Sequence, residues 1–192
     1  MKRFILGVFV LLIGVSLHAG QFGLKMGMTL SQIDKNARKI GDWTYEVKVP
    51  KPHSFFEFYS VQISPTKGLY SIKAVSKEID TSVYGTELKS SFDDLEKKLI
   101  KAYGKNKRLD YLSYDSIWSE PKDWMMALLK KERTLESYWN KDTKFKKVDN
   151  LQQIILSAIP FNTNTGYITL EYYYSNYDEC NKEKSAKEDS SL

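Results

Sequence analysis

Two stretches of the chain share one hairpin pattern, in which a glycine ends a short turn and an apolar-rich strand follows. Residues 66–72 read TKGLYSI, and residues 164–170 read NTGYITL. Turns of this length join neighbouring antiparallel strands, whereas parallel strands need a much longer crossover. The two patterns therefore predict that the chain folds around an antiparallel sheet.

Strand-like stretches also precede both turns. Residues 55–63 are aromatic and β-branched, and residues 151–161 are predominantly apolar. Further strands are predicted over residues 43–49, where apolar and polar side chains alternate, and over residues 133–139. Each half of the chain is therefore expected to supply several strands to the sheet.

Three segments have helical features. Thr29 is a suitable N-cap for a segment whose apolar residues recur at helical spacing until Gly41. A second amphipathic segment begins near the serines at 90–91 and stops at Gly104, which is a typical C-terminal residue. A short buried helix is predicted over residues 123–131.

These elements predict an α+β fold, in which an antiparallel sheet carries two amphipathic helices on one face. The two halves, residues 20–80 and 88–178, each read as a helix followed by strands that close with a hairpin. One interpretation is a pair of tandem helix–hairpin units, with an insertion in the second that holds the short helix. The other is coincidence, because glycine-terminated hairpins are common.

The first 19 residues have the order of a secretory signal peptide. Two basic residues precede an uncharged run from Phe4 to Leu17, and Ala19 offers a small residue for cleavage, with Ser16 as a second choice. The alternative is a membrane anchor, but the run of about 14 residues is shorter than the roughly 20 that a span needs. We therefore expect a periplasmic or secreted protein without stable membrane insertion.

After the leader, we expect one α+β domain over residues 20–180 and a disordered tail over residues 181–192, which lacks core residues before its end. Cys180 is the single cysteine, so an internal disulfide is impossible. In an oxidising compartment such a thiol is buried, free or paired with another chain. The sequence leaves these states, and the oligomeric state, open.

Few residues are suited to catalysis. His53 is the only histidine after the leader, and it follows Pro52 at the beginning of a predicted strand, where a surface role is usual. A zinc site needs three or four His, Cys or carboxylate ligands, and a glycine-rich phosphate loop is missing from the sequence. We therefore expect no catalytic histidine, no metal and no cofactor.

Two charged regions need a separate interpretation. The acids between positions 110 and 132 lie among tyrosines and tryptophans, so a carboxylate-dependent hydrolase of cell-wall polysaccharide is an alternative function. The basic clusters at 105–108 and 144–147 are typical of solvated loops. Because the leader carries two of the positive charges that make up the net charge of +5, the remaining charge is mild and no nucleic-acid partner is expected.

The beginning of the chain after the leader resembles a known kind of exported module. Residues 22–33 read FGLKMGMTLSQI, a short strand that leads through Gly-Met-Thr into a capped helix. This segment is similar to the helix–hairpin unit of SmpA/OmlA-like lipoproteins and β-lactamase-inhibitor-protein-like domains. The resemblance implies an α+β domain that binds other proteins without catalysis. The chain departs from the lipoproteins because no cysteine lies near the cleavage site.

The leading hypothesis is therefore a non-enzymatic protein-binding module, either an inhibitor or an accessory of envelope assembly, whose partner is a protein. Tyrosine and other aromatic anchors are what such an interface uses. From the alternation along the strands, the predicted contact residues on the aromatic-rich sheet face are Phe58, Tyr59, Tyr172 and Tyr174.

Overall fold

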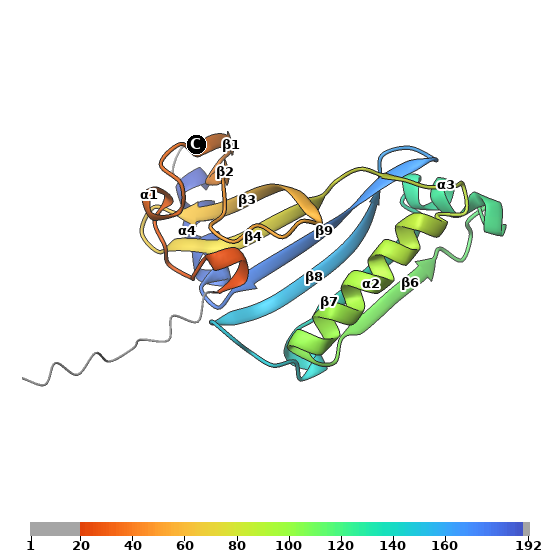
Figure 1. Cartoon of the computed structure of the whole chain (residues 1–192). Coiled ribbons are helices and arrows are strands. Elements are labelled where there is room, and N and C mark those ends of the chain that lie inside the picture. The colour runs from red at the N-terminus through yellow and green to blue at the C-terminus, as the bar shows by residue number, and fades with distance from the viewer. Residues whose placement is uncertain (1–19, 190–192) are drawn as a thin grey trace, which may run out of the picture.

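The protein is described by a computed structural model over residues 20–189, so the predicted signal peptide lies outside the described residues. One antiparallel sheet of nine strands with four helices and short 3-10 turns makes up this part of the chain, as the α+β prediction requires (Figure 1). None of these helices combines the length and apolar character needed to cross a bilayer.

The first half of the chain supplies five strands. Its elements in order are η1 (Gln21–Gly23), α1 (Leu30–Ile33), β1 (Arg38–Gly41), β2 (Thr44–Glu46), β3 (Phe56–Ser64), β4 (Gly68–Ser76) and β5 (Ile79–Asp80). The hairpin predicted around residues 66–72 is confirmed as β3–β4. Gly68 has φ 70°, and a Cβ there would lie 2.2 Å from the Gly27 carbonyl oxygen, so only glycine fits this turn.

The second half supplies four strands and the longest helix. Its elements are α2 (Thr86–Tyr103), β6 (Lys107–Leu112), η2 (Pro121–Asp123), α3 (Trp124–Leu129), β7 (Arg133–Trp139), η3 (Lys141–Thr143), β8 (Leu151–Pro160), β9 (Thr165–Tyr174) and α4 (Tyr177–Asp189). The strand predicted over 133–139, the short helix and the second hairpin are confirmed.

The strands lie in the order β1-β2-β3-β4-β9-β8-β7-β6, with β5 added beside β9. Each half therefore forms a four-strand meander after its helix, and the halves join where β4 pairs with β9. The two predicted hairpins are the last strand pair of their respective meanders, and η2 and α3 are inserted between β6 and β7. The shared topology agrees with tandem units, whose common sequence origin stays a prediction.

One face of the sheet carries the core. In the second half α2 covers this face with buried Leu88, Phe92, Leu95 and Leu99. In the first half the segment from Phe22 to Ile33 takes the same position, with Leu24 fully buried. Apolar burial of this kind is the main stabilising contribution in a domain without disulfides.

The predicted helix over 29–41 is wrong beyond its first turn. Thr29 does begin a helix through a capping box with Gln32, but α1 ends at Ile33. The Asp34 carboxylate then accepts hydrogen bonds from the backbone N–H of Asn36 at 2.9 Å and of Lys48 at 2.8 Å. These bonds favour a turn over a continuing helix, and the later residues form edge strand β1.

The N-cap of the second helix is Gly85, five residues before Ser90, the first of the two serines predicted to cap it. Thr86 follows Gly85, whose φ of 67° and close approach to the Trp124 ring require glycine. Glu87, in the first turn, accepts hydrogen bonds from the Thr81 hydroxyl and the Ser82 N–H, and these bonds hold the pKa of its carboxyl below the usual value. The end at Gly104 is confirmed.

The predicted disorder of residues 181–192 is wrong as far as Asp189, because α4 continues across residues 181–189. Tyr177 and Cys180 anchor this helix against Trp43 and Tyr70, which explains why so polar a segment is ordered. Residues 190–192 lie outside the described residues. Figure 1 places α4 on the opposite side of the sheet from α2.

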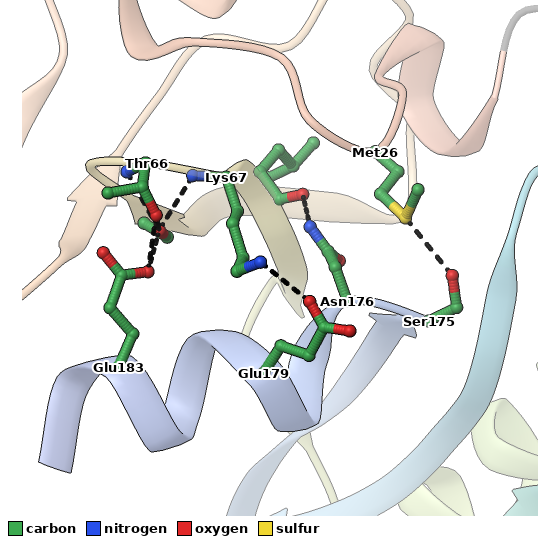
Figure 2. Close-up of polar contacts among 9 residues, drawn as sticks. Met26, Thr66, Lys67, Ser175, Asn176, Glu179 and Glu183 are labelled. Atoms are coloured by element: carbon green, nitrogen blue, oxygen red, sulfur yellow. Dashed lines mark hydrogen bonds and ion pairs between the residues drawn. The ribbon is translucent and has the colours of Figure 1, made fainter. Parts of the chain in front are cut away.

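Polar contacts hold α4 to the β3–β4 turn (Figure 2). The Glu183 carboxylate accepts hydrogen bonds from the Thr66 hydroxyl at 2.8 Å and the Ser64 hydroxyl at 2.7 Å. One turn earlier, Glu179 forms an ion pair with Lys67 at 2.8 Å. These contacts lower the pKa values of both carboxyl groups. The largest contribution is the hydrogen bond with Ser64 for Glu183 and the hydrogen bond with Lys67 for Glu179.

Candidate functional site

Three of the four predicted contact residues face the core. Tyr59, Tyr172 and Tyr174 are 6%, 5% and 0% exposed, so they are not available to a partner. The side chain of Phe58 is half-buried and points to the opposite face of β3 from that of Tyr59. Alternation along a strand separates two faces without saying which of them a helix covers, and for three of the four residues the prediction chose the covered face.

The other side of the same strands forms a surface that α2 leaves uncovered. We call this surface the open face and define it by half-exposed side chains of β3, β4, β7, β8 and β9: Phe58, Lys73, Val75, Glu136, Tyr138, Ile155, Tyr167, Glu171 and Tyr173. The cross-strand register aligns several of them in one row, since Lys73 pairs with Glu171, Glu171 with Ile155, and Ile155 with Tyr138.

Two Glu-x-Tyr pairs lie on the open face. The Tyr138 hydroxyl donates to Glu136, and the Tyr173 hydroxyl donates to Glu171, two residues back on the same strand in each case. Burial and the hydrogen bond to Glu171 raise the pKa of Tyr173, so this phenol stays protonated as a donor. The spacing 136–138 and 171–173 is the sequence signal that could have revealed this face.

The two carboxylates differ in their further partners. Glu171 also forms an ion pair with Lys73, with 2.9 Å between Oε1 and Nζ, whereas Glu136 accepts a second hydroxyl hydrogen bond from Ser157 at 3.1 Å. The face therefore combines a neutralised pair on one side with a carboxylate held by hydroxyls on the other. Such an arrangement holds both carboxylates, which are strong hydrogen-bond acceptors, in fixed orientations.

A polar hollow of ≈ 220 Å³ lies where the open face meets α4. Its lining is rich in hydroxyl, amide and charged groups, from Thr44, Ser60, Gln62, Ser71, Lys73, Glu171, Tyr173 and Tyr177. The Tyr173 and Tyr177 rings meet edge to face at a centroid distance of 4.7 Å. The hollow is smaller than the usual ligand pocket, which has a volume of about 300–1,000 Å³.

Beside the hollow, α4 buries the single cysteine. Cys180 is fully buried with Trp43 and Tyr70, so of the three states left open for this thiol the structure has the buried one. Burial raises the pKa of the Cys180 thiol, which disfavours the reactive thiolate. Burial likewise raises the pKa of the Tyr70 phenol to about 12.

The remaining candidates from the sequence have structural or surface positions. His53 is exposed, and its Nδ1 accepts a hydrogen bond from the Phe55 N–H at 3.2 Å. Among the acids of the 110–132 region, Asp110 pairs with Arg133 at 2.6 Å, while Asp115 is exposed. Across residues 20–189 no group of three His, Cys, Asp or Glu side chains is placed to hold a metal ion.

Comparison of the chain with protein-family models, curated protein sequences and solved structures gave no match. The function must therefore be inferred from the open face itself.

Proposed function

We propose that this protein is an exported, non-enzymatic protein-binding module, and that it binds its partner through the open face. The observation that carries the proposal is the concentration of Tyr138, Tyr167 and Tyr173, with Glu136 and Glu171, on the side of the sheet that α2 does not cover. An inhibitor or an accessory of envelope assembly is the kind of role that fits such a surface.

The chemistry of the side chains supports this function. Tyrosine gives a large contact area with few rotatable bonds, so little conformational entropy is lost on binding. Here two of the three phenols are already fixed by Glu136 and Glu171. A partner therefore meets a surface that is ordered before binding, which lowers the cost of association.

The charges of the open face suggest the chemistry of the partner. Lys73 neutralises Glu171, but the two hydrogen bonds of Glu136 come from neutral hydroxyls of Tyr138 and Ser157. A basic side chain on the partner, above all an arginine, would complement Glu136 with a charge-assisted hydrogen bond. We therefore expect the contacting patch of the partner protein to be polar and basic.

Affinity capture from the envelope fraction of the producing cell tests this function. The wild-type protein and a Tyr138→Ala, Tyr167→Ala double variant are used as matched baits, with Lys98→Ala, on the exposed side of α2, as the control. Tyrosine is enriched among the few hot-spot residues whose truncation to alanine weakens binding by about 2 kcal/mol or more. The proposal predicts loss of a specific partner with the double variant alone, and equal recovery with all three baits would contradict it.

A further inference from the structure

The last strand of the sheet has one open edge. In the order of the strands β6 pairs with β7 on one side and ends the sheet on the other. Its first five residues, Lys107 to Tyr111, are all exposed. A strand edge of this kind carries unpaired N–H and C=O groups that can add a further strand.

Exposed apolar side chains gather along and just beyond β6. Leu109 and Tyr111 are 36% and 52% exposed, and in the loop that follows, Ile117 is 78% and Tyr114 is 102% exposed. Single exposed apolar residues are ordinary on a protein surface, but four of the eleven large apolar side chains that are exposed in residues 20–189 lie within positions 109–117, and clustering of this kind is typical of an interaction site. The edge thus combines unpaired backbone groups with apolar side chains.

The hydrogen-bond pattern establishes which residues of β6 present their backbone outward. The Ser113 N–H donates to the Glu132 carbonyl at 2.7 Å, and the β6–β7 register continues from this pair without a shift. The N–H and C=O groups of successive residues point alternately to the two sides of a strand, so those of the odd-numbered β6 residues bond to β7. The N–H and C=O groups of Arg108, Asp110 and Leu112 therefore point to the open edge.

We propose that the β6 edge pairs antiparallel with β6 of a second copy of this chain, around a two-fold axis at Leu109. In this register Arg108 lies opposite Asp110 of the second copy, and Lys107 lies opposite Tyr111. Arg108 and Asp110 then form the hydrogen-bonded pairs, as their outward backbone groups require, and each pair joins opposite charges.

The neighbouring registers are unfavourable. A shift of the axis by one residue places either Arg108 opposite a second Arg108 or Asp110 opposite a second Asp110, and like charges directly opposite destabilise a sheet. Intramolecular ion pairs already hold both side chains on the helix side of β6, because Arg108 contacts Asp93 and Glu96, each at 2.7 Å, and Asp110 contacts Arg133. Charge complementarity therefore selects the axis at Leu109.

Single-cysteine variants test both the dimer and its register. In a Cys180→Ala background, Leu109→Cys places two thiols directly opposite at a non-hydrogen-bonded pair, where Cβ atoms are about 4.5–5.5 Å apart and small shifts allow a disulfide. Tyr111→Cys is the control, since two copies of position 111 would be about 13 Å apart, four residues along the strand. With diamide as oxidant, the Leu109→Cys chain should form covalent dimers about tenfold faster than the Tyr111→Cys chain.

A second experiment uses the unmodified chain at tens of micromolar in sedimentation-velocity measurements. Asp110→Pro removes one outward N–H donor while leaving the β6–β7 bonds in place, and Asp110→Ala is the matched control for the lost ion pair with Arg133. We expect a reversible dimer that Asp110→Pro weakens about tenfold more than Asp110→Ala does. A wild-type monomer at all concentrations, or equal cross-linking at positions 109 and 111, would overturn the proposal.

Discussion

Tyr172 and Tyr173 are sequence neighbours that the sheet directs to opposite sides, and their substitution by alanine tests this assignment. Tyr172 is buried, with ring centroids of Phe22 and Tyr103 at 5.8 Å and 6.2 Å. An aromatic side chain buries about 150–250 Å², worth about 4–6 kcal/mol at roughly 25 cal/mol per Å². Since measured truncations of core aromatics cost about 3–5 kcal/mol, we expect Tyr172→Ala to lower the free energy of unfolding by that amount.

Tyr173→Ala should cost far less, about 1 kcal/mol, because its half-exposed ring loses mainly the contact with Tyr177 and the hydrogen bond to Glu171. Urea titration followed by circular dichroism measures both values, with an unchanged slope as the sign of unaltered two-state unfolding. Equal losses for the two variants, or a larger loss for Tyr173→Ala, would refute the assignment of the faces.

Three further outcomes follow from other parts of the molecule. Glu96 is 7% exposed and accepts hydrogen bonds from Ser137, Asn106 and Arg108. Glu96→Ala should therefore lower the free energy of unfolding by about 3 kcal/mol in urea titration. The control Asp94→Ala, at an exposed position, should change it by no more than about 0.5 kcal/mol. The pKa values of Glu179 and Glu183 are lowered by docking of α4, so their stabilising contribution is complete above the ordinary glutamate pKa and is lost as the pH falls through the lowered values. Loss of these contacts should release α4 and expose Cys180, so dithiodipyridine should label Cys180 faster, relative to free glutathione, below about pH 4. Glu183→Gln should raise the labelling rate at neutral pH for the same reason. A relative labelling rate that does not change with pH would contradict this. If the leader is cleaved as proposed, N-terminal sequencing of protein recovered outside the cytoplasm should find Gly20 first, and an uncut chain in the cytosol would remove the basis for the proposed compartment.

Local patterns predicted much of the sheet. The two hairpins and the strand from Arg133 to Trp139 follow from turn chemistry and from β-branched and aromatic composition, which depend on neighbouring residues. The order in which the two meanders join at β4 and β9 depends on contacts distant in sequence, and no local pattern contains it.

Two errors arose where a tertiary contact overrides a local preference. The helical spacing after Thr29 continues to Gly41, but the Asp34 carboxylate binds the N–H of Lys48, fourteen residues away. The polar segment after Cys180 has the composition of a tail, yet the burial of Cys180 and the contacts of Glu183 with the β3–β4 turn order it. In both cases the decisive partner is remote from the segment in the chain.

Three of the four predicted contact residues have the wrong phase along their strands, and only Phe58 lies on the open face. On β9 the partly exposed side chain is that of Tyr173, whereas Tyr172 and Tyr174 are buried. Strand alternation fixes the two sets of residues, and only the position of α2 decides which set is covered. The repeated Glu-x-Tyr spacing on β7 and β9 would have indicated the uncovered set.

Photo-cross-linking in the producing cell tests most directly whether the open face binds a protein. A benzophenone amino acid is introduced singly at Tyr138, at Tyr167 and, as the control, at Lys98 on the exposed side of α2. We expect a cross-link to the same protein from both tyrosine positions and none from Lys98. Cross-links from Lys98 alone, or the same yield from all three positions, would contradict it.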